Sequence, residues 1–309
     1  MVRRFHAVGF GLLVLAAGIV LTGCGADTPG TVQAGVIRAL AAENEYGNVI
    51  QQIGGRYVSV TSIMNNPNVD PHTYEADSQN AIAMAKATLV VQNGAGYDAF
   101  MTKLESASAN PHQVVIDVAK ALGYGPRVKN PHFWYKPTTM PKVASIIARD
   151  LARQDPSHRQ YFEQHLKKFD RSLIRWTASL TQLQRQFARA PVAVTEPVAD
   201  YLLTAAGLDI KTPWALQAAI MNGTDPSPQA VQIEDNLLKH RRVKVFVYNR
   251  QVVDATTSAF IAVAKKYHIP IVGVYETMPL RSSYQRWMQA EVAALRAALK
   301  SGKSTVNLK

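Results

Sequence analysis

The sequence predicts an α/β protein of two lobes, each a mostly parallel sheet flanked by helices, joined by one long rigid backbone helix. Short apolar runs alternate with helical stretches, and the alternation occurs twice along the chain. This pattern is typical of parallel sheets covered by helices. Between the two series lies an unbroken helical stripe of apolar side chains. At 309 residues, the chain is long enough for two lobes with sizeable cores.

The two series are expected to contain seven strands and eight helices, taken in chain order. In the first series we expect strands at 36–41, 57–63, 88–92 and 113–117, and helices near 46–54, 76–86, 97–106 and 140–153. In the second series we expect strands at 191–194, 243–248 and 270–274, and helices near 197–206, 228–239, 255–267 and 281–299.

Eight apolar side chains between the two series recur at alternating spacings of four and three residues. They are Phe162, Leu166, Phe169, Leu173, Trp176, Leu180, Leu183 and Phe187. No glycine or proline interrupts them, so the spacing predicts one helix of about 26 residues and roughly 39 Å. A coiled-coil partner would explain the same stripe. The aromatic content and the position between the series favour a helix packed across both lobes.

The N-terminal segment has the features of an export signal. Arg3 and Arg4 are followed by an apolar run of about 15 residues, which is too short for a stable membrane span. Small residues then lead to Cys24, the only cysteine in the chain. The ending Leu-Thr-Gly-Cys resembles the bacterial lipobox, in which the cysteine becomes the lipidated first residue. The alternative is a simple signal peptide with an accidental cysteine.

These features predict five consecutive segments. They are a lipoprotein signal peptide at 1–23, a lipidated tether at 24–35, an N-terminal α/β lobe at 36–155, an interlobe helix at 156–189 and a C-terminal α/β lobe at 190–309. The formal net charge of +12 is spread along the chain. For an exported protein we expect no nucleic-acid partner, and the charge does not identify the ligand.

Polar residues that follow the predicted strands are the candidates for a binding site, because ligands of open α/β sheets bind at the carboxyl ends of the strands. His72 lies in a proline-rich loop after the second strand, and His132 follows the fourth strand and a short helix. Glu196 and Glu276 come directly after two strands of the second series. Two imidazoles and two carboxylates on one rim indicate a four-ligand site for a divalent transition metal.

Each candidate also has a structural interpretation. His72 could be a turn histidine, and His132 could pack on its aromatic neighbours. Glu196 could be a carboxylate at a helix N-terminus, and Glu276 a surface carboxylate in a loop. The other histidines that follow the leader are expected to be structural: His112, His158, His165, His240 and His268.

At these positions the chain resembles the metal-binding solute-binding lipoproteins of zinc and manganese ABC importers (cluster A-I, adhesin-like family). Segment 70–75 (DPHTYE) resembles the first ligand motif of the family, and segment 130–134 (NPHFW) resembles the second. Segment 195–202 aligns with the third ligand, here Glu196, and Glu276 falls where the family commonly has aspartate. The long helix is similar to the family's interlobe helix.

Three features depart from the family pattern. Lys136 replaces an acidic residue that usually follows the second motif, which leaves the support of His132 open. Segment 248–251 (YNRQ) replaces a more common glutamate-containing one, and no His-rich or acidic loop separates the two candidate histidines.

The resemblance implies an extracytoplasmic lipoprotein that carries one divalent metal ion, Mn²⁺ or Zn²⁺, to an ABC permease. Carboxylate donors favour manganese, whereas zinc outcompetes manganese at most N/O sites, so the metal stays open. We expect a lipid-anchored monomer on the outer face of the cell membrane, with no enzymatic activity. The alternatives are an adhesin-like structural lipoprotein and a tethered metallohydrolase. No HExxH or GxSxG motif or phosphate loop supports the hydrolase.

Overall fold

The computed structural model describes residues 35–69, 71–108, 110–125 and 128–308, except for the side chain of His72. The predicted signal peptide and the tether up to residue 34, including Cys24, lie outside the described residues. Within the described ranges, no helix is long and apolar enough to cross a membrane.

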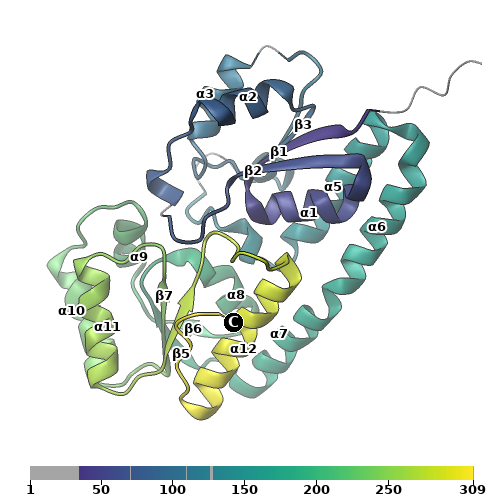
Figure 1. Cartoon of the computed structure of the whole chain (residues 1–309). Coiled ribbons are helices and arrows are strands. Elements are labelled where there is room, and N and C mark those ends of the chain that lie inside the picture. Colours follow the sequence, from purple (N-terminus) through teal and green to yellow (C-terminus); the bar gives the residue numbers. More distant parts are fainter. Residues whose placement is uncertain (1–34, 70, 109, 126–127, 309) are drawn as a thin grey trace, which may run out of the picture. The chain divides into compact units, whose positions relative to one another are not determined.

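Two four-stranded sheets form the framework (Figure 1). The N-terminal sheet contains β1 (Ile37–Glu43), β2 (Val58–Met64), β3 (Leu89–Gln92) and β4 (Val114–Asp117), in the order β2-β1-β3-β4. The C-terminal sheet contains β5 (Pro191–Val194), β6 (Asp209–Ile210), β7 (Val245–Asn249) and β8 (Ile271–Val274), in the order β6-β5-β7-β8. All their pairings are parallel. The predicted α/β class with two parallel sheets is therefore confirmed.

The strand order places a topological switch point in each sheet. Strand β1 pairs with the next strand, β2, at one edge and with β3 at its other edge. Strand β5 pairs with β6 and β7 in the same way. The crevice outside such a point is where open α/β sheets bind ligands. The central strands form because their residues are apolar on both faces; Leu40, Ala41 and Ala42 of β1 are fully buried.

The helices lie close to their predicted positions. Those of the N-terminal half are α1 (Asn44–Gly54), α2 (Ser78–Lys86), α3 (Phe100–Ala107), α4 (Val118–Ala121) and α5 (Thr139–Gln154). Those of the C-terminal half are α8 (Asp200–Ala205), α9 (Trp214–Met221), α10 (Pro228–Lys239), α11 (Ala255–Lys266) and α12 (Tyr284–Ser301). Side-chain caps from Asp77, Ser227, Asp254 and Ser283 begin α2, α10, α11 and α12. Strand β6 and helix α9 were not predicted.

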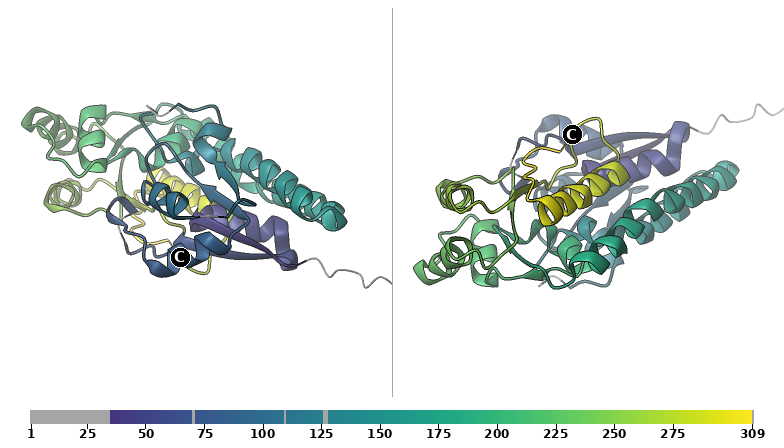
Figure 2. Two further views of the ribbon diagram at one scale, coloured as in Figure 1. Left: turned by 90° about the horizontal axis from the view of Figure 1, so that it is seen from above. Right: turned by 90° about the horizontal axis from the view of Figure 1, so that it is seen from below.

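The predicted long helix consists of two helices in succession, α6 (Arg159–Ser172) and α7 (Ile174–Phe187). They meet at Leu173, whose backbone stays in the right-handed helical region and whose N–H bonds to the carbonyl of Asp170, three residues back. Ser172 and Thr177 donate hydroxyl hydrogen bonds to nearby helix carbonyls, which is a known cause of a local change in helix geometry. Figure 2 shows that the two helices continue in nearly one direction.

The apolar stripe of these helices packs as predicted. Six of its eight side chains are buried, and Leu166 and Phe187 are half-buried against the same core. That core includes strands of both sheets, and α12 packs along α7. The stripe is therefore an intramolecular contact surface.

Candidate metal centre

Glu196 and Glu276 lie at equivalent places in the C-terminal sheet. Each is the second residue after a strand, β5 for Glu196 and β8 for Glu276. Both are buried, at 3% and 0% exposure. Because parallel strands end at the same edge of a sheet, the backbone directs both residues to the carboxyl edge.

His132 is held by a neighbouring amide. Its Nδ1 lies 2.8 Å from Oδ1 of Asn130, and its backbone N–H donates to the same oxygen at 3.0 Å. The Asn130 Nδ2 group donates to the carbonyl of Pro197 at 2.7 Å, which fixes Oδ1 as the acceptor. Nδ1 of His132 must then carry a hydrogen, and in the neutral ring Nε2 presents a lone pair. This tautomer is the one that binds a metal through Nε2.

His132 and Glu276 meet directly. Nε2 of His132 lies 3.2 Å from Oε2 of Glu276, and both side chains are fully buried. Tyr97 donates its hydroxyl to the same Oε2 at 3.0 Å, and Nδ2 of Asn249 donates to Oε1 at 2.5 Å. The imidazole therefore approaches a carboxylate that two other donors already orient.

The geometry of this pair fits two ligands of one ion. A lone pair on Nε2 and a carboxylate oxygen repel each other unless a proton or a cation lies between them. An ion about 2.1 Å from both atoms would see them at an angle of roughly 100°, between the tetrahedral and octahedral values. The residues present thus suit a divalent metal.

Glu196 belongs to the same neighbourhood. The carbonyl of Pro197, the next residue, accepts the hydrogen bond from Asn130 that fixes the His132 tautomer. Glu196 precedes the short turn Pro197–Ala199 but makes no side-chain capping bond to it. Its position agrees with the alternative interpretation as a carboxylate at a helix N-terminus, so its role as a ligand stays a prediction.

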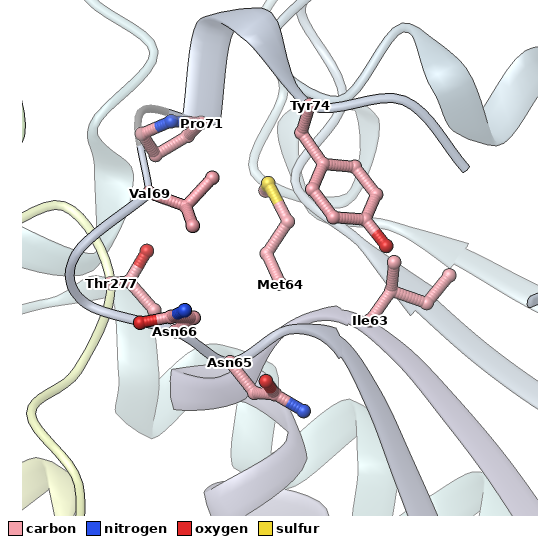
Figure 3. Close-up of a pocket in the computed structure, with 8 residues that line it drawn as sticks. All are labelled: Ile63, Met64, Asn65, Asn66, Val69, Pro71, Tyr74 and Thr277. Carbon is pink, nitrogen blue, oxygen red and sulfur yellow. The ribbon is translucent and has the colours of Figure 1, made fainter. Parts of the chain in front are cut away.

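His72 lies in the short turn Pro71–Thr73, and its side chain and the whole of Asp70 lie outside the described residues. The loop before it reaches the C-terminal half, because Gln251 Nε2 donates to the carbonyl of Val69 at 2.7 Å. A cavity of about 240 Å³ lies under this loop; Val69, Pro71, Tyr74 and Thr277 line part of it (Figure 3). Since Thr277 follows Glu276, the backbone of the His72 turn lies near the Glu276 segment.

Among the described side chains, no three of the histidine, cysteine, aspartate and glutamate type form a metal-holding group, and this set excludes the side chain of His72. The structure thus brings His132 and Glu276 together and joins Asn130, the partner of His132, to Pro197, the residue after Glu196.

Further acidic residues lie buried behind the carboxyl edge of the N-terminal sheet. Burial, with Asp98 and Glu45 nearby, raises the pKa of Glu43 well above its ordinary value. Burial, with Glu276 nearby, does the same to the pKa of Glu45. Burial also raises the pKa of Asp98 to about 6. The raised pKa of each of these acids favours its neutral form.

Three residues of the site were missed from the sequence: Asn130 as the partner of His132, and Tyr97 and Asn249 as partners of Glu276. Asn249 ends β7 and Tyr97 follows β3, so the rule that found the carboxylates covers them as well. Asn130 supplies the support of His132 that the replacement of an acidic residue by Lys136 had left open. That lysine donates to the Tyr124 hydroxyl and lies over the rings of Tyr124 and Tyr201.

Two histidines assigned structural roles have structural partners. His158 Nδ1 lies 2.5 Å from a carboxylate oxygen of Asp155, and its ring stacks on Tyr57. His165 Nδ1 lies 2.9 Å from the carbonyl of Gln52, so it ties α6 to α1. The ring of His132 also packs edge-on against Trp134, so its aromatic packing and its contact with Glu276 coexist.

Two parallel sheets with a buried imidazole and carboxylates between them define a two-lobed α/β binding protein. The model of the family described as zinc-uptake complex component A, periplasmic, matches residues 40–298, so the chain belongs to this family. The predicted family resemblance is therefore confirmed.

Individual relatives agree with this assignment. The manganese-binding lipoprotein MntA of Bacillus subtilis (strain 168) is 25% identical over 272 residues, covering 84% of this chain and 86% of that protein. The crystal structure of ZnuA superposes with a TM-score of 0.69 at 23% identity, covering 86% of this chain and 98% of that one. A mutant of the laminin-binding adhesin Lmb from Streptococcus agalactiae gives 0.71 at 20% identity, covering 85% and 100%. The likeness to these two structures concerns the fold.

Proposed function

We propose that this protein captures one divalent transition-metal ion, manganese or zinc, between its two lobes and delivers it to the permease of an ABC importer. The proposed ligands are His72, His132, Glu196 and Glu276. The observation that carries this proposal is the buried contact of 3.2 Å between His132 Nε2 and Glu276 Oε2, with the imidazole held in the metal-binding tautomer.

Family membership supports the transport role, and a relative named as a manganese-binding lipoprotein supports the class of ion and the lipid anchor. We therefore propose that Cys24 carries the lipid and that the mature protein is an extracytoplasmic monomer, anchored to the cell membrane near its permease. We retain lobe boundaries at 36–155 and 190–309, with the interlobe helix at 156–189, as part of this proposal.

Capture and release need only a small tilt of the lobes. Several hydrogen bonds join the two halves close to the site. Asn44 exchanges two bonds with the backbone of Met278, Tyr135 donates to the carbonyl of Tyr275, and Tyr284 donates to the carbonyl of Trp134. Because these bonds flank the site, we expect ion release to open the ligand cluster while most of the interlobe contact persists.

Carriage without catalysis is favoured by the proposed ligand shell. Four protein ligands close the coordination sphere of a zinc-like ion, whereas catalytic sites usually keep a position for water. The alternative of a structural adhesin predicts no metal dependence of stability.

Elemental analysis of protein purified without added metal tests this function. The wild type should carry one divalent ion per chain, and Glu196→Ala should lose it, whereas Glu163→Ala, on the exposed face of α6, should keep it. Added zinc or manganese should raise the melting temperature of the metal-free protein, because the ion binds only the folded state. An unchanged metal content in Glu196→Ala would exclude Glu196 as a ligand. No bound ion and no rise in melting temperature would exclude metal carriage.

A further inference from the structure

Asn249 is placed to control how Glu276 meets an ion. It ends β7, is 1% exposed and donates through Nδ2 to Oε1 of Glu276 at 2.5 Å. Its own Oδ1 accepts the backbone N–H of Gln251 at 3.0 Å. Because turning the amide over would break both bonds, the N–H side must face the carboxylate.

The backbone of Glu276 is fixed from the same segment. Oε1 of Gln251 accepts the backbone N–H groups of Glu276 and Thr277 at 2.7 and 2.8 Å. The carboxylate therefore cannot follow a moving backbone away from Asn249. Segment 249–251 holds Glu276 both at its main chain and at one carboxylate oxygen.

The two oxygens of Glu276 consequently have different roles. Oε2 faces Nε2 of His132 and the hydroxyl of Tyr97, whereas Oε1 is occupied by Asn249. An ion beside His132 would meet Oε2 first, and chelation by both oxygens would require the carboxylate to turn Oε1 toward the ion, away from the orientation that the bond from Asn249 fixes. Breaking a buried hydrogen bond to a charged group is costly.

We propose, on the basis of the proposed function, that Asn249 allows only one oxygen of Glu276 to bind the ion. Asn249 would thereby set the ratio of the affinities for zinc and manganese. Zinc in protein sites is usually four-coordinate, whereas manganese favours six oxygen-rich ligands. A second carboxylate oxygen would therefore benefit manganese more than zinc. By holding Oε1, Asn249 keeps the number of donors low and disfavours manganese relative to a site with a chelating carboxylate.

The substitution Asn249→Leu tests this role, since leucine has nearly the shape of asparagine and no donor. We expect the ratio of the manganese to the zinc dissociation constant to fall about tenfold, because the carboxylate is then no longer held by Asn249 and can turn Oε1 toward the ion. Competition titration against a chromophoric chelator, with each ion alone, measures the ratio. X-ray absorption of the manganese form should detect one additional oxygen in the first coordination shell. Asn249→Ser, too short to reach Oε1, carries the same expectation if the leucine variant does not fold.

Asn130→Leu is the matched control. It makes the same chemical change beside His132, which can offer only one nitrogen to an ion. It should weaken the binding of both ions by a similar factor and leave the ratio of their dissociation constants within about twofold of the wild type. An unchanged ratio and an unchanged shell in Asn249→Leu would overturn the proposal while leaving metal carriage intact. A wild-type protein that binds neither ion would instead refute the proposed function itself.

Discussion

The two sheets have the same winding but place their candidate ligands differently. In the C-terminal sheet, Glu196 and Glu276 each lie two residues after a strand. In the N-terminal sheet, β2 ends at Met64, eight residues before His72, and β4 ends at Asp117, fifteen residues before His132. The carboxylates are therefore positioned by the sheet, and the histidines by loops.

This difference shows where the site depends on side-chain support. Strand pairing of β5 and β8 with β7 fixes the start of both carboxylate segments. His132 depends instead on Asn130, whose amide joins the histidine to Pro197 in the other half. Substitutions that leave the strands intact should thus affect the histidine side through its supporting hydrogen bonds.

The largest expected effect is the loss of a directly bound group from either side. His132→Ala and Glu276→Ala should each weaken zinc binding by more than about 100-fold, since losing a ligand costs more than losing an outer partner. Isothermal titration measures this change. Glu45→Gln is the control, because burial raises the pKa of Glu45 and so favours its neutral form, which glutamine matches in shape and charge. Its affinity should stay within about threefold of the wild type. A comparable loss in Glu45→Gln would show that the site has no distinct ligand pair.

A smaller effect is expected from the support of His132. Asn130→Leu removes the acceptor of the Nδ1 hydrogen and should weaken metal binding by about 10- to 100-fold. Lys136→Met should leave the affinity unchanged, because Lys136 bonds to Tyr124 and not to the histidine. Titration of both variants with zinc distinguishes them. If the lysine variant lost as much affinity as the asparagine variant, the assignment of Asn130 as the support of His132 would fail.

Much of the fold was predictable because burial leaves a periodic pattern. Strand β5 and helix α10 were predicted to the residue, since each is a clear apolar or capped segment. Strand β6 has only two residues, too few for any period, and α9 is apolar on most of its surface, which removes the helical contrast. The boundary between α6 and α7 at Leu173 coincides with local hydrogen bonds, and the spacing of apolar residues does not reveal these bonds.

The candidate site was predictable only in part, for a related reason. Glu196 and Glu276 follow from strand ends, and His72 and His132 from local motifs. Their partners act over long distances in the chain: Asn130 reaches Pro197 across 67 positions, and Tyr97 reaches Glu276 across 179. Such contacts depend on how the two halves meet, and no local spacing encodes that.

The pH dependence of stability also distinguishes the two halves, because their buried acids should titrate over different ranges. Burial raises the pKa of Asp98 in the N-terminal half from 3.8 to about 6, and that of Glu234 on α10 from 4.5 to about 8. A raised pKa means that the folded chain holds a proton which the unfolded chain has already lost. Each group therefore lowers stability as the pH rises from its unfolded to its folded pKa, by at most about 1.4 kcal/mol per pH unit.

Neutral substitutions separate the two contributions in the metal-free protein. Glu234→Gln should gain stability relative to the wild type continuously from pH 5 to pH 8, because the amide never loses a proton. Asp98→Asn keeps only one of the two oxygens that accept the backbone N–H groups of Asn93 and Gly94, which shifts its stability at every pH. Its difference from the wild type should nevertheless change between about pH 4 and 6 and stay constant above that range. Urea unfolding at each pH gives both curves. Parallel curves for the two variants would show that the acids of the two halves titrate alike, although backbone hydrogen bonds lower the pKa of Asp98 and not that of Glu234.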